Sequence, residues 1–360
     1  MTFPSFSKSS RVWCLLTAFA CLGLSTDTAS AQSSTATHAT PKKTTTKKTI
    51  SRNAATSRTS SSAALRRARA RSRAAVQAQL LREAQEPRFR LDESGALVPD
   101  VRAEAAIIYD SATGHVLWES NSQDQRSIAS ITKVMTAVVF MEGSPDLSEE
   151  IVVQPSDVRA ASTTYIRSGY RVTKGDLLHL TLMASDNAAA RALARVSSLG
   201  SEAFIERMNT KAAELGLQST SYSDPSGLLA ANVSSAYDMA KLISYVSGDE
   251  RISGVMRKQT YTVNAGRRAI NIHSTNQLVM NGDVDVQAGK TGFISKSGYC
   301  LAALLRLPQG GPPVAVVVLG AKSNAGRFWE TRHLFNWFAS KAEDLLGTPL
   351  QAATAGATAN

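Results

Sequence analysis

The sequence has 360 residues, of which 43% are hydrophobic, and this composition excludes a multi-span membrane protein while allowing one or two folded domains. Its three cysteines exclude a disulfide framework. The formal net charge of +11 is typical of a protein that binds a polyanion such as nucleic acid, so its meaning depends on where the charge lies.

Residues 1–31 have the features of a secretory signal peptide. A basic start at Lys8 and Arg11 precedes an apolar stretch over 12–24, and small residues over 29–31 form a cleavage site. We therefore expect an exported, periplasmic protein that is soluble or loosely associated with the envelope. An uncleaved membrane anchor is the alternative.

Two of the cysteines, Cys14 and Cys21, lie in this signal peptide. Attachment of a lipid at Cys21 is an alternative to export as a free protein, although residues 18–20 are an unusual approach to a lipidated cysteine. Cys300 lies in the apolar run 299–305, so we expect a small core residue rather than a catalytic thiol.

The basic charge is concentrated in residues 32–90, which contain 14 basic and two acidic residues and carry +12. Residues 91–360 carry −2, so the folded part is not expected to bind nucleic acid. Within the basic arm, 32–62 is rich in Ser, Thr, Ala and Lys and is expected to be disordered. Residues 63–86 are rich in Ala, Arg and Gln and have high helix propensity.

Two interpretations of the arm remain open. It is either a solvated linker or an electrostatic contact with anionic polymers of the cell envelope. Residues 349–360 read as a second disordered tail, which leaves a folded domain over 91–348.

Hydrophobic periodicity, turn residues and caps predict the elements of that domain. Thr173 and Asp176 form a predicted capping box before the second helix. In chain order we expect a hairpin of strands over 105–109 and 115–118, helices over 131–141, 177–183, 188–196, 203–215 and 236–246, strands over 286–293, 299–307 and 314–319, and a last helix over 325–346.

This order of elements has no regular alternation of strands and helices, so a doubly wound parallel sheet is not expected. Strands occur near both ends of the domain, and the helices lie between them. We therefore predict an α/β fold of the α+β type, with an antiparallel sheet built from both chain ends and an inserted helical cluster.

Three short motifs stand in order in this domain. They are Ser130-x-x-Lys133, Ser185-Asp186-Asn187 and Lys290-Thr291-Gly292. Each motif alone is weak, because S-x-x-K recurs at 5–8 and S-x-N recurs at 51–53. The ordered set is specific, because the first motif falls at a helix start, the second at a break between helices and the third on a strand.

The spacing of the first motif suits the activation of a serine. Residues i and i+3 of a helix share a face, so Lys133 can reach the Ser130 hydroxyl. At the helix N-terminus, Ser130 lies where backbone N–H groups and the helix dipole favour a developing anion. Lys133 acts as a base only as the neutral amine, and both burial and the charge of Lys290 would lower its pKa.

The other two motifs suit proton transfer and substrate binding. Ser185 can pass a proton between Lys133 and a leaving group, and Asn187 can bond Lys133 or a substrate amide. The third motif suits recognition of a carboxylate through its lysine and threonine, and its glycine lets a substrate approach the strand backbone.

Competing catalytic motifs do not occur in the sequence. G-x-S-x-G, H-E-x-x-H and C-x-x-C do not occur, so we predict neither a metal site nor a cofactor. His179 lies within an expected apolar helix and is interpreted as structural.

With these motifs, the sequence resembles the serine D-alanyl-D-alanine peptidases, the low-molecular-mass penicillin-binding proteins, over residues 100–345. The resemblance implies a β-lactamase/transpeptidase-like fold, peptidoglycan as the substrate and β-lactam antibiotics as acylating inhibitors. The stretches that carry it are 127–137, 183–187, 224–228, 232–234 and 290–293.

The resemblance also implies roles for the motif residues. Ser130 would form the acyl-enzyme, Lys133 would accept its proton and Ser185 would assist. Lys290 would bind the substrate carboxylate. The backbone N–H groups of Ser130 and Phe293 would form the oxyanion hole.

Within this group, the sequence is most similar to the type-7 D-alanyl-D-alanine endopeptidases. The carboxypeptidases usually carry histidine after K-T-G and add a C-terminal β-domain with an amphipathic anchor. Here Phe293 follows the motif, and only the polar stretch 351–360 follows the last helix. A carboxypeptidase that trims stem peptides, and a non-catalytic cell-wall binding protein on the same fold, are the alternatives.

A β-lactamase is not expected. The class A enzymes use a glutamate between the second and third motifs for deacylation. The comparable stretch 219–229 has Asp224 followed by Pro225, which indicates a turn rather than a base. We therefore expect slow deacylation of penicillin, and hence sensitivity to it.

The charge of the arm leads to a first prediction. Deleting residues 32–86 is expected to reduce salt-sensitive sedimentation of the protein with cell envelopes, because most of the positive charge is removed. Acylation by labelled penicillin is the control and should be unchanged. Equal sedimentation of the two forms would make the arm a spacer.

Overall fold

The computed structural model describes residues 53–346. The predicted signal peptide over 1–31 and the predicted tail over 349–360 lie outside these residues. The chain divides into two compact units, 1–66 and 67–360. Among the described residues, no helix is sufficiently long and apolar to span a lipid bilayer.

Helix α1 (Asn53–Gln85) occupies much of the basic arm. It covers 63–85, where high helix propensity was noted, and begins ten residues earlier, so a helix replaces the disorder expected over 53–62. Ala, Arg, Gln and Leu are strong helix formers and dominate 63–85, whereas 53–62 is rich in Ser and Thr. The helix lacks an apolar face, and its Leu65 and Val76 are exposed.

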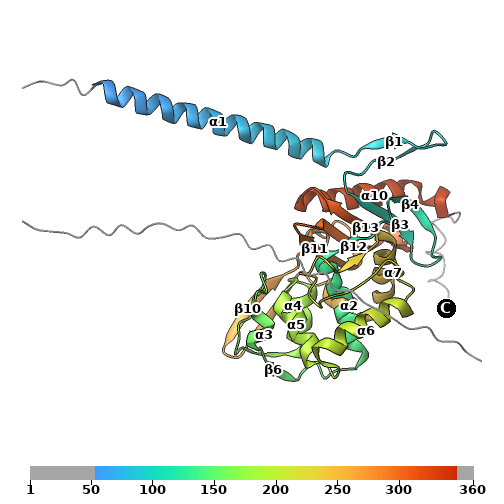
Figure 1. Cartoon of the computed structure of the whole chain (residues 1–360). Helices are drawn as coiled ribbons and strands as arrows, with labels where there is room; N and C mark the ends of the chain where they lie inside the picture. Colours follow the sequence, from blue (N-terminus) through green and yellow to red (C-terminus); the bar gives the residue numbers. More distant parts are fainter. Residues whose placement is uncertain (1–52, 347–360) are drawn as a thin grey trace, which may run out of the picture. The chain divides into compact units, whose positions relative to one another are not determined.

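A five-stranded antiparallel sheet forms the centre of the folded domain (Figure 1), with strand order β11-β12-β13-β3-β4. The strands are β3 (Ala105–Asp110), β4 (Val116–Ser120), β11 (Asp285–Ile294), β12 (Gly298–Arg306) and β13 (Pro313–Ala321). Strand β13 pairs with β3 in the register Val317 to Ile107, which joins the two ends of the domain. The predicted sheet and its antiparallel order are confirmed.

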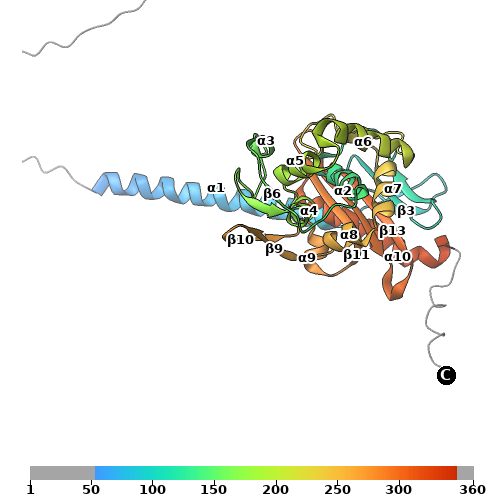
Figure 2. The same cartoon turned by 90° about the horizontal axis from the view of Figure 1, so that it is seen from below.

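Both faces of the sheet are covered, and side chains alternate between the two resulting cores. Val316 packs in the core that contains Phe328 and Phe338 of α10 (Asn324–Leu346). The next residue, Val317, packs in the larger core formed with the helical cluster. This alternation places the sheet between α10 and that cluster (Figure 2).

The helical cluster contains the five predicted helices and two short ones. The predicted helices are α2 (Thr132–Glu142), α4 (Lys174–Leu182), α5 (Asn187–Val196), α6 (Gly200–Glu214) and α7 (Ala236–Val246). The short ones are α3 (Pro155–Val158) and α8 (Glu250–Met256), whereas the short helix α9 (Gln277–Asn281) packs in the core with α10. The predicted capping box is confirmed, because the Thr173 side chain accepts from the Asp176 backbone N–H at 2.9 Å. Cys300 is buried, as expected.

Short strands form four further pairs that sequence periodicity did not indicate. They are β1 (Phe89–Leu91) with β2 (Leu97–Pro99), β5 (Arg126–Ser127) with β8 (Val233–Ser234), β6 (Glu150–Val152) with β7 (Arg171–Thr173), and β9 (Thr260–Ala265) with β10 (Arg268–His273). Most are too short to show an alternating pattern.

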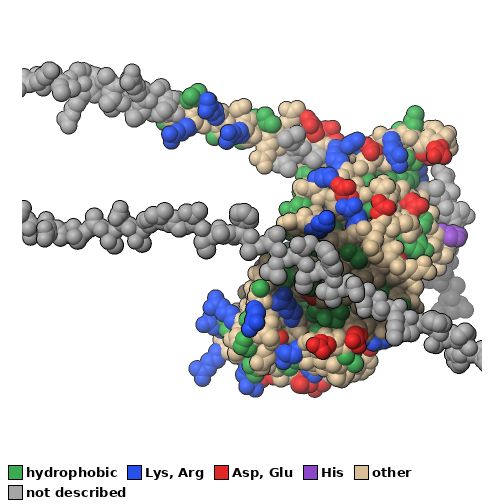
Figure 3. Space-filling model, in the orientation of Figure 1, with side chains coloured by type: hydrophobic (Ala, Val, Ile, Leu, Met, Phe, Trp, Pro, Cys, Tyr) green, Lys and Arg blue, Asp and Glu red, His purple; other side chains and the backbone are tan. Residues whose placement is uncertain are grey.

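Figure 3 shows Lys and Arg side chains gathered over the end of the domain that carries β6 and β10.

The turn η1 (Ala129–Ile131), a 3₁₀ helix, precedes α2 and is packed tightly against a glycine. Gly227 has a φ of +77°, and a Cβ placed there would lie 2.1 Å from the Ala129 carbonyl oxygen. Only glycine therefore fits both the backbone conformation and the space at this position.

We predict that Gly227→Ala lowers the free energy of unfolding by about 3 kcal/mol or more, because backbone strain and a backbone clash add. Gly169 is the matched control: its φ is +84°, and nothing lies within 4 Å of its Cβ position. Gly169→Ala should therefore cost only about 1–2 kcal/mol of strain. Equal losses in thermal or urea unfolding would contradict this account of Gly227.

Candidate active site

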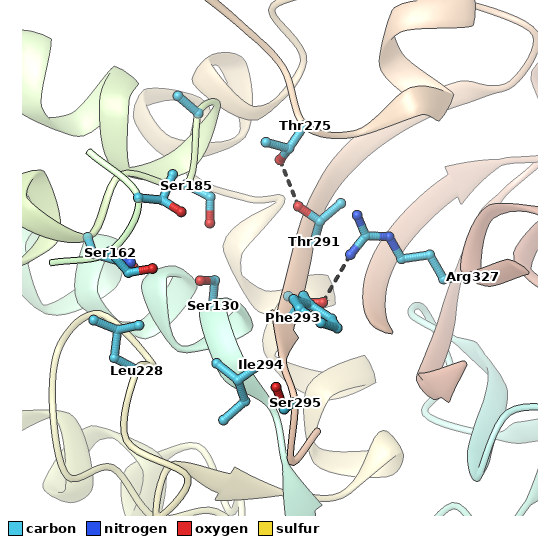
Figure 4. A pocket seen from close by; sticks show the side chains of 14 residues that line it. Ser130, Ser162, Ser185, Leu228, Thr275, Thr291, Phe293, Ile294, Ser295 and Arg327 are labelled. Atoms are coloured by element: carbon cyan, nitrogen blue, oxygen red, sulfur yellow. Dashed lines mark hydrogen bonds between the residues drawn. The ribbon is translucent and has the colours of Figure 1, made fainter. Parts of the chain in front are cut away.

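A cavity of about 520 Å³ opens between β11 and the helical cluster (Figure 4). Six of the eight predicted site residues line it: Ser130, Ser185, Asn187, Thr291, Gly292 and Phe293. The other two, Lys133 and Lys290, are buried, and each bonds a serine of the lining. All three motifs therefore meet at one site.

Ser130 lies in η1, directly before α2, so the expected position at a helix start is confirmed. The preceding residue, Ala129, has a φ of +47°, which is strained for a residue with a side chain. Strand β11 approaches this turn closely at Gly292. A Cβ on Gly292 would lie 2.7 Å from the Ile128 carbonyl oxygen and 3.2 Å from the Ser130 nitrogen.

The Lys133 amine is enclosed by three oxygen atoms. Its Nζ lies 2.9 Å from Ser130 Oγ, 2.6 Å from Asn187 Oδ1 and 2.5 Å from the Ser226 carbonyl oxygen. The side-chain oxygen of Asn187 and the backbone carbonyl oxygen of Ser226 can only accept hydrogen bonds. The two N–H groups of a neutral Lys133 amine therefore donate to them. Its lone pair then faces the Ser130 hydroxyl, which is the arrangement that a general base requires.

Burial lowers the pKa of Lys133 to about 7, because the charged ammonium loses its hydration. The negative charges of Asp224 and Asp186 act in the opposite direction, and Arg191 adds to the lowering. A large fraction of Lys133 is therefore neutral near pH 7. The expected lowering of its pKa by burial is confirmed, but the positive charge that adds to it is that of Arg191 and not of Lys290.

The loop from Asp224 to Asn232 positions the Ser226 carbonyl, a contact that the motifs did not indicate. The Asp224 carboxylate accepts from the backbone N–H groups of Ser226, Gly227 and Leu229 at 3.1, 3.2 and 3.3 Å. It also accepts from the side chains of Ser226 and Asn232. The carboxylate therefore holds a turn, as the following proline indicated.

Ser185 lies at the break between α4 and α5, with a φ of +58°. The next residue, Asp186, caps α5 by accepting from the Ala189 N–H at 2.9 Å. The cap and the strained turn direct the Ser185 hydroxyl toward the cavity, where it accepts from Lys290 Nζ at 2.9 Å.

A loop over 159–167 forms the wall of the cavity beside this turn. Asp186 accepts from the Tyr165 N–H at 2.6 Å, and the Asn187 N–H donates to the Thr163 carbonyl at 3.1 Å. The Asn187 side chain donates to the Ala161 carbonyl at 2.7 Å. The second motif therefore fixes this wall as well as contacting Lys133.

Lys290 is a second buried amine at the site. Its Nζ donates to Ser185 Oγ and to the Thr291 carbonyl, both at 2.9 Å. Burial, then the charges of Lys133 and Arg327, hold the pKa of Lys290 well below its usual value. Two ammonium groups in one desolvated region disfavour each other, and here the charge of Lys133 supports the neutral form of Lys290.

The remaining motif residues lie along β11. The Thr291 hydroxyl lies 2.7 Å from that of Thr275. Phe293 is half exposed and stacks on Tyr299 at a ring-centroid distance of 4.2 Å. Its exposed face borders the cavity mouth.

Arg327 of α10 is a cavity residue that sequence reasoning missed. Its guanidinium donates to the carbonyls of Gly292 at 2.9 Å and Cys300 at 3.2 Å. Burial lowers the pKa of Arg327 to about 10. The residue belongs to no short motif, so only the packing of α10 on the sheet brings it to the site.

His179 is a structural residue, as predicted. It stacks on Tyr261 at 3.7 Å, and its Nδ1 lies 2.8 Å from the Gly175 carbonyl oxygen. Over residues 53–346, no group of three or more His, Cys, Asp or Glu side chains is placed to hold a metal ion.

Comparison with known sequences gives one family and a set of bacterial relatives. The D-alanyl-D-alanine carboxypeptidase family (peptidase S11) matches residues 92–323. The chain is 33% identical to the D-alanyl-D-alanine endopeptidase of Escherichia coli over 244 residues, which are 66% of this chain and 78% of the relative. It is 32% identical to that of Pseudomonas aeruginosa over 245 residues, 67% and 78% of the two chains.

Two solved structures are similar in fold and sequence. A mutant of a Streptomyces DD-transpeptidase has a TM-score of 0.62 and 28% identity, and the match covers 67% of this chain and 98% of that one. A Listeria monocytogenes penicillin-binding protein in its cefotaxime-bound form has a TM-score of 0.58 and 29% identity, with coverage of 66% and 97%. The predicted transpeptidase-like fold is confirmed.

The lowered pKa of Lys133 predicts the pH dependence of Ser130 acylation. With the neutral amine as the predicted base, the rate constant for acylation by a fluorescent penicillin should rise with pH and reach half its maximum near pH 7. Further below that pH, the rate should fall about tenfold per unit.

Two variants test the assignment. Lys133→Arg should lose acylation at every pH, because a guanidinium stays protonated. Lys322→Met, which changes an exposed lysine paired with Glu104, should keep the wild-type profile. A pH-independent rate between pH 5 and 9 in the wild type would contradict the role of Lys133.

Proposed function

Because the chain belongs to the D-alanyl-D-alanine carboxypeptidase family of serine peptidases, we propose that it is an endopeptidase that hydrolyses the peptide cross-links of peptidoglycan through an acyl-serine intermediate. One observation carries the proposal: the buried Lys133 amine, with a pKa of about 7, lies 2.9 Å from the Ser130 hydroxyl in an open cavity. The relatives named as endopeptidases support the choice of a cross-link as the bond that is cut.

Acylation begins with attack of Ser130 Oγ on the carbonyl carbon of the scissile bond. The hydroxyl proton passes to the neutral Lys133, and a C–O bond forms. The negative charge moves to the substrate oxygen, which the backbone N–H groups of Ser130 and Phe293 would stabilise. The close approach of Gly292 to the Ser130 nitrogen supports this pairing of the two N–H groups.

The tetrahedral intermediate then collapses. The C–N bond breaks, the leaving amine takes a proton that originates from Lys133, and Ser185 is placed to pass it on. Its hydroxyl accepts from Lys290, so its own proton is free to point into the cavity. Lys133 returns to the neutral form, ready to activate the water that releases the acyl group in a second, equivalent attack.

Lys290 and Thr291 are suited to a substrate carboxylate. Thr291 lines the cavity, and Lys290 lies behind it with its charge suppressed by burial. A carboxylate bound at this strand would supply the opposite charge that favours the ammonium form of Lys290. Substrate binding would therefore also increase the positive charge near Lys133.

A carboxypeptidase that removes terminal D-alanine is the second candidate. The family description itself favours it, and relatives named as carboxypeptidases share 29–31% identity with this chain. The same acyl-serine chemistry serves both reactions, so the difference lies in which acyl donor the cavity accepts.

Export to the periplasm, acylation by β-lactam antibiotics and an envelope contact of the arm complete the proposal. The signal-like residues 1–31 support export. The β-lactam-bound relative supports the antibiotics as inhibitors. The arm supports an electrostatic contact, because α1 has exposed arginines and lacks an apolar face that would insert into lipid.

The proposal predicts that the purified protein converts cross-linked muropeptide dimers to monomers. Ser130→Ala should abolish this conversion, and it should also abolish labelling by fluorescent penicillin, because both begin with the same nucleophile. Chromatography of the digest compares the loss of dimers with the appearance of free D-alanine.

Release of D-alanine without loss of dimers would favour the carboxypeptidase. Neither reaction, together with no penicillin label on the wild type, would favour a non-catalytic wall-binding protein. Ser94→Ala is a matched control, because this exposed serine lies between β1 and β2 and its hydroxyl bonds Asp92 rather than any cavity residue.

A further inference from the structure

Five exposed arginines lie at the end of the domain that carries the β6–β7 and β9–β10 pairs. We call them the arginine face: Arg159, Arg167, Arg171, Arg267 and Arg268. Figure 3 shows the basic side chains gathered at this end. The clustering contrasts with the whole of residues 91–360, which carry a net charge of −2.

The arginine face begins at the wall of the cavity. Arg159 and Arg167 are the two ends of the loop over 159–167, and Ser162 and Thr163 of the same loop line the cavity. Arg191, behind the loop, donates to the Arg159 carbonyl at 2.6 Å and holds that end in place.

The face continues from this loop to the tip of the β9–β10 hairpin. Arg171 opens β7, and its carbonyl accepts from the Gly266 N–H at 3.1 Å. Gly266 directly precedes Arg267 and Arg268, so the hairpin tip is attached beside β7. The result is a continuous cationic surface that runs from the cavity wall to the hairpin.

Acidic residues do little to neutralise this surface. The segments 159–171 and 257–273 contain seven Lys or Arg residues and neither Asp nor Glu. The nearby Asp157 is buried and bonds Arg195 at 2.8 Å. Glu150 reaches Arg171 only at 3.4 Å, and both of these side chains are largely exposed.

We infer that the arginine face binds free carboxylates of the peptidoglycan polymer, and so holds neighbouring stem peptides while one cross-link occupies the cavity. This inference rests on the proposed function. A stem that ends in D-alanine without a cross-link presents a free α-carboxylate, and the planar guanidinium binds carboxylates through two parallel hydrogen bonds. Six of the seven basic residues in 159–171 and 257–273 are arginine, and the surface adjoins the cavity, which favours the substrate polymer over a remote partner.

The test compares two triple variants of the full chain that lose the same charge. Arg167→Gln/Arg267→Gln/Arg268→Gln removes three arginines of the face. The control, Arg251→Gln/Arg306→Gln/Lys322→Gln, removes three cations that already pair with Asp249, Asp285 and Glu104. Each protein is first acylated with penicillin, which shows that the cavity is intact and prevents digestion, and is then sedimented with purified sacculi.

We expect the face variant to bind sacculi about eightfold more weakly than the wild type, at about twofold for each of the three exposed ion pairs that are lost. The control variant should bind as the wild type does. The difference should disappear in high salt, and also with sacculi whose carboxylates have been converted to amides.

Equal binding by the two variants would overturn the inference. A difference in binding between the two variants that persists on amidated sacculi would also overturn it. So would a difference that is seen on phosphatidylglycerol vesicles but not on sacculi. If the face variant is not acylated, the double variant Arg267→Gln/Arg268→Gln, which changes only the hairpin tip, replaces it in the comparison with the control. If the wild type binds sacculi as expected but cuts no muropeptide dimer, the proposed function fails while the binding result stands.

Discussion

The buried Lys133 amine is the constraint on which the site depends. A desolvated ammonium is costly, and the cost falls when the group is neutral and its hydrogen bonds are satisfied. Three oxygens from three separate segments meet this need: Ser130 Oγ, Asn187 Oδ1 and the Ser226 carbonyl. Any movement of these segments would leave a buried polar atom without a partner, so the geometry of catalysis and the packing of the domain are maintained by the same bonds.

The close approaches around the nucleophile follow from this arrangement. Gly227 and Gly292 let two backbone segments pack on η1, where a single Cβ would clash. Positive φ values at Ala129 and Ser185 add backbone strain beside the reacting groups. Such strain costs about 1–3 kcal/mol for each residue, and it persists because the surrounding packing outweighs it. Packing thus fixes the backbone at Ser130 and Ser185, the proposed nucleophile and proton relay, as preorganised catalysis would require.

Local patterns in the sequence predicted the main elements well. The capping box at Thr173, the apolar run and turn of the β3–β4 hairpin and the apolar helices each follow from interactions between residues close in the chain, which a single sequence records. The short strand pairs β6–β7 and β9–β10 were missed. Strands of three residues, as in β6, have no readable period, whereas β9 does alternate, with Tyr261, Val263 and Ala265 on its buried side, so that pattern was overlooked. Part of the arginine face lies on those strands, so the sequence alone did not indicate that its residues lie on one side of the domain.

The sequence by itself determined the chemical groups and one geometric relation: Ser130 and Lys133 share a helix face because they are three residues apart. It also determined that the net positive charge belongs to the arm. Only the tertiary structure decided which groups meet Lys133 and Lys290, because the partners lie 54, 93 and 105 residues away in the chain. It likewise decided that both amines are desolvated, since burial is a property of packed elements and not of a motif. The residue types therefore supplied a possible base, and folding placed it where burial lowers its pKa.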